Sequence, residues 1–518
     1  MKLRKGRDRK MTLQEKIGQR LFGGFPGLHM SPEFIALVRE YKVGNVVLFK
    51  HNIESNQQLK QLCAEIQQLI REETGHDAFI SIDQEGGCIT RLSEDAVNVP
   101  GAMALVATGD SHNAFLAATL TGSELAALGI NFNLAPVVDI NNNPDNPIIG
   151  SRCFGDTAET VVAYALEAVR GYESCGILSC AKHFPGHGDT ASDSHVSLPL
   201  IDKSLEQLEQ LELKPFRAMV DAGCPAIMTT HILFPQVEKK HVPATMSQTI
   251  ITKLLKEKMG YQGLVVSDCM EMDAIGKFYG TAKGAVAAAA AGVDMIMVSH
   301  STKRLREAAQ EIRRAVENGT ISMEEMDQSV EKILSFKKKY CRVSFGTAGS
   351  AEAFAACRAL REKSIVLISG PLPSLGDKPF FVGCADYRAG LVSNVQQDSF
   401  TFPEYMAQKI GGTAMVTAPN PHRDEIAKAV SCASGCSCIV VGTYNGHLFE
   451  GQMQLVRELG KLDLPMIVTA LRNPYDLKHL PEHAAGVAAW DYSMMTMELL
   501  VPVLIGKKVP TGKLPVTI

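Results

Sequence analysis

The chain has 518 residues, of which 46% are hydrophobic and 21% charged, and its formal net charge at pH 7 is −4. This length exceeds what one hydrophobic core usually supports, so it predicts two or three domains. The slightly acidic balance excludes the basic surface by which proteins bind nucleic acid, and nucleic acid is therefore not an expected partner.

The N-terminus is basic but leads into an amphipathic segment instead of the apolar run of a secretory signal. Thr12 and Glu15 have the spacing of a capping box, which predicts a helix that begins here and extends to about Leu21. No stretch approaches the roughly 20 apolar residues that a membrane span needs. Thirteen cysteines, an odd number without a disulfide framework, are typical of reduced thiols. We therefore expect a cytoplasmic protein that does not associate with membranes.

Short apolar runs alternate with amphipathic stretches from Leu21 to about residue 300. Each run has the length of a buried strand. The predicted strands are residues 21–24, 45–49, 79–83, 132–140, 178–182, 226–230, 264–268 and 295–299. The clearest helical patterns between them are residues 55–73, 111–128, 157–175 and 204–222. This alternation predicts a TIM-type (β/α)8 barrel.

Polar residues gather where the predicted strands end, as a barrel with a site at its carboxyl edge requires. The segments concerned are Asp83-Gln-Glu85, Asp139, Lys182-His183, Thr230-His231 and Ser267-Asp268. Polar residues that served only the core would not be concentrated at the carboxyl ends of the strands. The carboxyl edge of the barrel is therefore the predicted site.

Helical patterns at residues 302–318 and 323–339 follow the barrel, and then the pattern breaks near Gly346 and Gly349. A second alternation begins beyond this break. Its predicted strands are residues 364–368, 379–382, 413–417, 438–443, 465–470 and 486–489. They predict an open, mostly parallel αβα sandwich. We thus expect a catalytic barrel domain at residues 1–340, a linker at 341–360 and a smaller αβα domain at 361–518.

The loop after the fifth predicted strand is the richest in reactive side chains. It reads K-H-F-P-G-H-G-D-T-A-S-D-S-H and begins at Lys182. Taken by its residues alone, it could be a glycine-rich turn whose histidines are on the surface or hydrogen-bonded, but this density of titratable groups favours one of two kinds of site. His183, His187, Asp193 and His195 are all credible metal ligands. Alternatively, His195 could transfer protons while Asp193 fixes its tautomer.

The pattern K-H-F-P-G-H-G-D-T-x-x-D-S-H closely resembles the signature of the family 3 glycoside hydrolases of the β-N-acetylglucosaminidase type. The resemblance covers residues 10–340 strongly and 360–518 weakly. It implies that the loop works without a metal or another cofactor. It also implies that His195 is the general acid/base and that Asp193 is its partner.

The segment V-V-S-D-C-M-E-M-D resembles the nucleophile segment of the same family and places Asp268 in the reacting position. A retaining glycosidase needs such a carboxylate to attack the anomeric carbon. Glu271 and Asp273 are the local rivals, but they lie beyond the predicted strand. By its position alone, Asp268 could equally cap the next helix.

The resemblance also implies five substrate-binding residues. Asp83 matches the acceptor of a sugar hydroxyl, Arg91 and Arg152 match substrate-contacting arginines, and Lys182 and His183 match paired hydroxyl donors. A charged lysine at a buried strand end needs an acceptor, which favours a site over a solvated surface.

Two cysteines depart from the family pattern. Cys88 stands where the family often has an arginine, and Cys269 stands where it more commonly has aspartate or alanine. Neither change removes a catalytic group, so they concern the subsites beyond the terminal sugar.

The resemblance implies a retaining exo-β-N-acetylglucosaminidase that hydrolyses terminal β-linked N-acetylglucosamine in muropeptides or chitin oligomers. A phosphorylase on the same scaffold stays open, because a histidine acid/base does not repel phosphate. A family 3 β-glucosidase or β-xylosidase and a metal-dependent barrel hydrolase are further alternatives. An inactive sugar-binding protein should have lost Asp268 or His195, and both are present. The oligomeric state cannot be predicted from these patterns.

Overall fold

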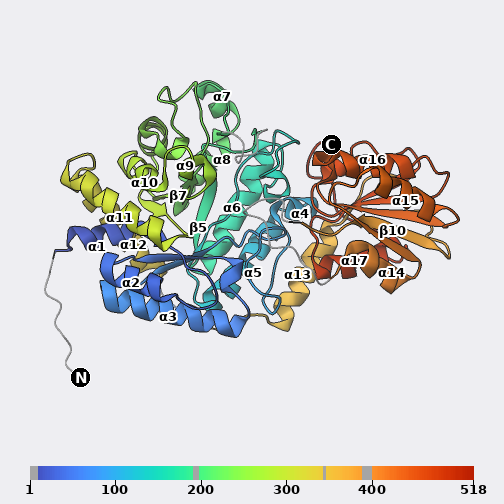
Figure 1. The fold of residues 1–518 in the computed structure, drawn as a ribbon, viewed down its shortest axis with the longest axis horizontal. Helices are drawn as coiled ribbons and strands as arrows, with labels where there is room; N and C mark the ends of the chain where they lie inside the picture. The colour runs from blue at the N-terminus through green and yellow to red at the C-terminus, as the bar shows by residue number, and fades with distance from the viewer. Residues whose placement is uncertain (1–9, 191–197, 342–345, 388–399) are drawn as a thin grey trace.

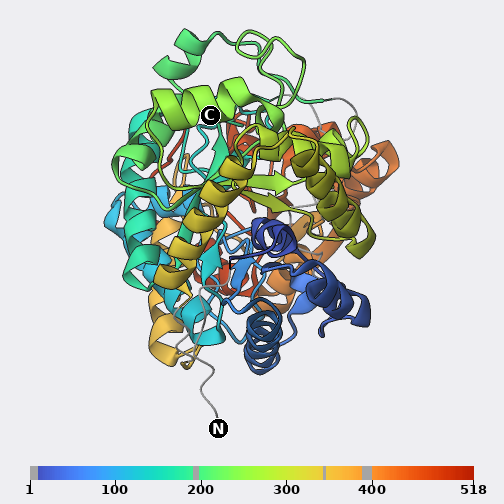
Figure 2. The same ribbon diagram turned by 90° about the vertical axis from the view of Figure 1, so that its left-hand side faces the viewer.

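The computed structural model describes residues 10–190, 198–341, 346–387 and 400–518. They form two domains that lie side by side: a barrel, coloured blue to yellow, and a second domain, coloured orange to red (Figure 1). Seen from the barrel's end of the molecule, the second domain lies behind the barrel (Figure 2). No helix in these ranges is long and apolar enough to cross a membrane.

Eight parallel strands close into a barrel in sequence order, which confirms the predicted TIM-type fold. The strands are β1 (Leu21–Gly23), β2 (Asn45–Leu48), β3 (Phe79–Ile82), β4 (Phe132–Asn133), β5 (Leu178–Phe184), β6 (Ala226–Thr229), β7 (Leu264–Cys269) and β8 (Met295–Met297). The strand β4 is shorter than the predicted 132–140. Pro136 lies in this stretch and has no N–H for a ladder hydrogen bond.

Helices surround the barrel in the predicted alternation. They are α1 (Leu13–Arg20), α2 (Pro32–Tyr41), α3 (Asn56–Thr74), α4 (Ala102–Ala107), α5 (His112–Leu128), α6 (Ala158–Ser174), α7 (Leu205–Gln210), α8 (Leu213–Asp221), η4 (Thr249–Lys258), α9 (Asp273–Gly276), α10 (Thr281–Ala290), α11 (Thr302–Glu317) and α12 (Met323–Tyr340). The capping box of Thr12 and Glu15 is present. The single helix predicted at 204–222 is instead two, α7 and α8, because the backbone at Leu211 leaves the helical region.

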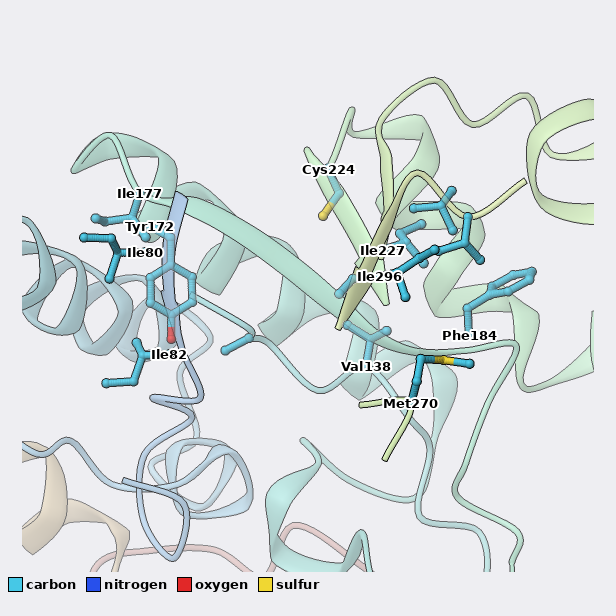
Figure 3. Close-up of a cluster of buried hydrophobic side chains, with 14 of the residues drawn as sticks. Ile80, Ile82, Val138, Tyr172, Ile177, Phe184, Cys224, Ile227, Met270 and Ile296 are labelled. Carbon is cyan, nitrogen blue, oxygen red and sulfur yellow. The ribbon is translucent and has the colours of Figure 1, made fainter. Parts of the chain in front are cut away.

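The barrel strands alternate between two apolar layers. Phe79 points into the barrel, where its ring meets Phe132 at 5.5 Å between centroids. Its neighbours Ile80 and Ile82 face outward and pack under the helices, in the same cluster as Phe184 (Figure 3). This period of two leaves both faces of each strand buried. The carboxyl ends of the strands are thereby free to carry polar side chains.

The second domain contains a six-stranded sheet with the order β11-β10-β12-β13-β14-β9. Its strands are β9 (Val366–Leu367), β10 (Pro379–Cys384), β11 (Thr413–Thr417), β12 (Cys438–Thr443), β13 (Met466–Ala470) and β14 (Ala484–Ala488). Only β9 is antiparallel to its neighbour within these described strands. Its helices are α14 (Phe402–Ile410), α15 (Arg423–Ala433), α16 (Glu450–Leu459) and α17 (Met494–Leu504). The predicted open αβα sandwich is confirmed.

The connection between the domains packs on the barrel. The predicted linker at 341–360 includes the start of α13 (Ala351–Ser364), which buries Cys357 and Leu360 in the barrel's outer core. On the same helix, Arg361 pairs with Asp491 of the second domain and donates from Nη2 to the carbonyl oxygen of Asn98 at 2.9 Å. The helix therefore ties the two domains together.

Candidate active site

A cavity of about 420 Å³ lies at the carboxyl ends of the barrel strands. Residues from the ends of β2, β3, β5, β7 and β8 contribute to its wall. The polar lining residues are Lys50, His51, Asp83, Arg91, Arg152, Lys182, His183, Asp268, Cys269, Glu271, Ser299 and His300. The apolar lining residues are Val47, Phe49, Leu134, Met228, Met272 and Met297. The volume is in the range of sites for small molecules.

Glu85 joins two of the predicted binding residues from below the cavity wall. Its carboxylate accepts two hydrogen bonds from Arg152, at 2.9 Å from Nε and 2.8 Å from Nη2. It also lies 2.7 Å from Nζ of Lys182, which reaches Asp83 at the same distance. Burial would raise the pKa of Glu85, but Arg152 and Lys182 outweigh this and hold it far below its ordinary value. Glu85 is thus a buried anion that fixes both cations.

Asp139 fixes the position of His183. The ring Nδ1 of His183 lies 2.7 Å from Oδ2 of Asp139, and the backbone N–H groups of His183 and His187 also donate to this carboxylate. Burial would raise the pKa of Asp139, but the two histidines and these hydrogen bonds lower it below its usual value. Because a carboxylate accepts, Nδ1 of His183 carries a proton and Nε2 is the nitrogen available to a ligand.

Asp268 lies near the end of β7 and lines the cavity. Burial would raise its pKa, but His231, His183, the amide of Cys269 and Lys182 together lower it below the ordinary value. The Cys269 amide donates to Oδ1 of Asp268 at 2.7 Å. Asp268 is therefore ionised at neutral pH, as a nucleophilic carboxylate must be.

His231 supports the segment that follows Asp268. Its Nε2 donates to the carbonyl oxygen of Cys269 at 3.0 Å, and its Nδ1 lies 2.9 Å from Oγ1 of Thr245. Burial lowers the pKa of His231, so the ring is neutral near pH 7. A neutral ring that donates from Nε2 holds the backbone at Cys269 in place.

The cavity brings together six residues predicted from the sequence: Asp83, Arg91, Arg152, Lys182, His183 and Asp268. Arg91 is buried, with only 4% of its surface exposed, and its backbone N–H donates to Oε1 of Gln84 at 2.7 Å. The predicted Asp193 and His195 lie outside the described residues, so their roles stay predictions.

The described base of their loop is held at two points. Asn146 donates from Nδ2 to the carbonyl oxygens of His187 and Gly188, at 2.8 and 2.9 Å. Lys203 pairs with Asp189 at 2.6 Å and also with Glu212. The residues that precede Asp193 and His195 in the chain are therefore held in place as far as the structure describes them.

Sequence reasoning did not assign a role to several residues of the site. Glu85 and Asp139, which were noted only as polar residues at strand ends, act behind the cavity wall. His51 and His300 line the cavity, as does Glu271, which was considered only as a rival nucleophile. The signal for the first two was present, because both lie where a predicted strand ends. The other three lie on loops after β2, β7 and β8, where side-chain direction does not follow from a strand period.

A metal site was the main alternative interpretation of the loop that begins at Lys182. In the described ranges, no group of three or more His, Cys, Asp or Glu side chains is arranged to hold a metal ion. His187 bonds through Nδ1 to Oγ1 of Thr190 at 3.1 Å, and burial and the nearby His183 lower its pKa to about 4.

An ionised aspartate at the end of a barrel strand, surrounded by paired charged hydrogen-bonding groups, is typical of barrel enzymes that act on carbohydrates. The model of the glycosyl hydrolase family 3 N-terminal domain matches residues 12–336. The chain therefore belongs to glycosyl hydrolase family 3, which confirms the predicted family.

Known relatives carry related names. The structure of a family 3 β-N-acetylglucosaminidase from Paenibacillus sp. str. FPU-7 is 39% identical, with a TM-score of 0.92 over 98% of this chain and 99% of that one. A β-hexosaminidase of Neisseria meningitidis serogroup C is 35% identical over 52% of this chain and 75% of its own length. A β-hexosaminidase A of Pseudoalteromonas piscicida is 34% identical over 60% of this chain, and the match spans only 56% of that protein.

Proposed function

We propose that this protein is a retaining exo-β-N-acetylglucosaminidase that hydrolyses terminal β-linked N-acetylglucosamine. The observation that carries the proposal is Asp268, an ionised carboxylate in a cavity that Asp83, Lys182 and His183 also line. Family membership and the names of the relatives support the same activity.

In this mechanism, Asp268 attacks the anomeric carbon and forms a covalent glycosyl-enzyme. Asp83 accepts a hydrogen bond from a sugar hydroxyl, Lys182 and Arg152 donate to others, and Nε2 of His183 contacts a further hydroxyl. Because Glu85 already holds Arg152 and Lys182, these donors keep their positions when the sugar arrives. Fixed donors of this kind reduce the reorganisation that the reaction needs.

His195 is the proposed general acid/base, with Asp193 as its partner. The sequence motif supports these roles, and the residues just before the loop segment, Asp189 and Thr190, are held by Lys203 and Asn146. His195 would protonate the leaving oxygen and later activate the water that releases the sugar from Asp268. An imidazole with an ordinary pKa near 6.5 suits this exchange at neutral pH.

The natural substrates we propose are muropeptide fragments or chitin oligomers that end in N-acetylglucosamine. The proposed location is the cytoplasm. All thirteen cysteines are free, and many of them are buried, which agrees with a reducing compartment.

Labelling of the nucleophile tests the proposal. A 2- or 5-fluoro glycoside should attach to Asp268, and Asp268→Asn should abolish both labelling and turnover of an aryl β-N-acetylglucosaminide. Asp273→Asn serves as the matched control and should keep activity, because Asp273 does not line the cavity. Labelling at Glu271 or Asp273 would assign the nucleophile to another carboxylate. Preference for the aryl β-glucoside or β-xyloside would contradict the proposed sugar.

A further inference from the structure

Buried polar atoms without hydrogen-bond partners gather at the carboxyl edge of the second domain's sheet. They lie at the ends of β12 and β13 or just beyond and are Thr443 Oγ1, His447 Nε2, Thr469 Oγ1, Arg472 Nε and Asp476 Oδ2. Buried polar atoms in folded proteins are nearly always paired, so each exception needs an explanation. In open α/β sheets this edge, near the point where the strand order reverses, is where ligands bind. Here the order reverses at β10, which lies between β11 and β12.

Arg472 is the charged member of this group. Only 4% of its surface is exposed, and its guanidinium lies 5.5 Å from the ring centre of Tyr444. Its Nη1 donates to the Tyr444 hydroxyl at 3.3 Å, and within the described ranges no carboxylate forms an ion pair with it. By contrast, the buried Arg152 and Arg361 each pair with a carboxylate. A buried cation without an ion-pair partner is costly, so its retention indicates that an anion binds there.

Arg472 adjoins the contact between the second domain and the wall of the barrel cavity. The next residue, Asn473, accepts at Oδ1 from the N–H of Ser151 at 2.7 Å, and Ser151 directly precedes the cavity residue Arg152. Contact is close here, because a Cβ on Gly150 would lie 2.6 Å from the same oxygen of Asn473. The second domain is thus fixed at the cavity wall.

Cys88 gives a second link between Arg472 and the cavity. It lies near Arg472 and also near Arg91 and Arg152, both of which line the cavity. Cys88 follows the loop segment of Asp83 and Glu85. Arg472 of the second domain therefore lies close to the loop that carries Asp83.

We propose that Arg472, with the hydroxyl of Tyr444, forms an anion subsite that binds a carboxylate carried by the part of the substrate beyond the terminal sugar. The inference rests on the proposed glycosidase function. An exo-acting enzyme encloses the terminal sugar, so groups from a second domain at the cavity wall meet the remainder of the substrate. The planar guanidinium matches a carboxylate in two parallel hydrogen bonds, which the Nε and an Nη nitrogen can supply.

A matched substrate pair tests the proposal. The pair is a β-N-acetylglucosaminyl disaccharide whose second sugar carries a carboxyl group, and the same molecule as its methyl amide. The wild-type enzyme should turn over the acid with a kcat/KM about 10- to 100-fold higher than the amide, the usual worth of a hydrogen bond to a charged group. Arg472→Met should lose this preference and keep its rate on the amide within about threefold.

The control is Arg358→Met, which removes a cation from an exposed ion pair with Glu498 that joins α13 to α17. It should keep the full acid preference. Equal rates on acid and amide in the wild-type enzyme would overturn the proposal, as would a preference that survives Arg472→Met. The comparison of acid and amide in the wild-type enzyme needs no variant, so it tests the proposal even if Arg472→Met folds poorly.

A free anion, instead of a carboxylate of the substrate, could also bind to Arg472. Thermal unfolding is therefore measured with inorganic phosphate and without sugar. If the wild-type enzyme shows no preference for the acid, and phosphate raises its thermal midpoint but not that of Arg472→Met, then Arg472 binds a free anion and not the substrate. Turnover of a neutral aryl β-N-acetylglucosaminide reports separately on the proposed function. An enzyme that hydrolyses this compound yet ignores the carboxyl group retains its function and lacks the subsite.

Discussion

Asp139 and His183 form a buried pair in which the imidazole Nδ1 lies 2.7 Å from a carboxylate oxygen. The same carboxylate accepts from the backbone N–H groups of His183 and His187, at 3.2 and 2.8 Å. One side chain therefore orients a substrate-binding ring and also holds the start of the loop that carries His195.

Asp139→Asn should weaken sugar binding. An amide side chain cannot accept from all three donors, and it can present an N–H to groups that are themselves donors. Loss of hydrogen bonds to a charged group costs about 1.5–3 kcal/mol, so we expect kcat/KM to fall by about 10- to 150-fold, mainly through KM. Steady-state kinetics on an aryl β-N-acetylglucosaminide measure this. Asp145→Asn, in an exposed turn of the same connection, should match the wild-type rate.

Much of the barrel could be predicted because its strands are short apolar runs in a regular alternation. The polar residues at the ends of the predicted strands placed Asp83, Lys182 and Asp268 in one site, because the carboxyl ends of parallel strands lie at a common edge. The second domain's contribution could not be predicted in this way. The hydrogen bond between Ser151 and Asn473 joins residues 322 positions apart, and no local pattern encodes it.

Glu85→Gln should destabilise the protein as well as its sugar site. The substitution is nearly isosteric but leaves Arg152 and Lys182 with one fewer buried counter-charge. Removing one partner of a buried ion pair costs about 3–5 kcal/mol. Urea unfolding should therefore show a lower midpoint than for Glu72→Gln, a control on the exposed face of α3. An unchanged midpoint would mean that water or a rearranged side chain replaces the carboxylate.

Lys337 should make stability increase with pH. It is buried under the barrel, donates to Oε1 of Gln19 and to the carbonyl oxygen of Gly44, and lies over the ring of Phe79. Burial lowers its pKa from 10.5 to about 8. Between these two values the unfolded chain binds the proton and the folded chain does not, so folding is favoured as pH rises through this window.

The comparison with Lys337→Met isolates this effect from other titrating groups. The cost of burying the charge is present below about pH 8 and is lost by pH 10.5, a change of about 3 kcal/mol. The wild-type protein should therefore gain stability relative to Lys337→Met when urea unfolding is measured first at pH 7.5 and then at pH 10. Lys338→Met, at the exposed neighbouring position, should show no such change. A constant difference between wild type and Lys337→Met would place the lysine pKa near its ordinary value.

Dialysis against a strong chelator should leave activity intact. The described ring contacts of the loop are to protein groups, since Nδ1 of His183 bonds to Asp139 and Nδ1 of His187 to Thr190. We assign the loop to sugar contacts and proton transfer. Activity that disappears on dialysis and returns with added zinc or manganese would instead make the loop a metal site.

His195→Ala should affect two kinds of substrate differently. As general acid, His195 must protonate the leaving oxygen, which matters greatly when a sugar leaves and little when a nitrophenolate of low pKa leaves. The first half-reaction should therefore slow by about 10²–10⁴ for a disaccharide and much less for an activated aryl glycoside. As general base, His195 also activates the water that releases the sugar from Asp268. The variant should thus accumulate the glycosyl-enzyme on the aryl substrate and show a burst of nitrophenolate in rapid-mixing experiments.

Asp193→Ala should show the same pattern more mildly, because Asp193 only orients the imidazole and stabilises its charged form. Equal slowing on both substrates, without a burst and with weaker binding, would make His195 a binding residue and assign the proton transfer to another group.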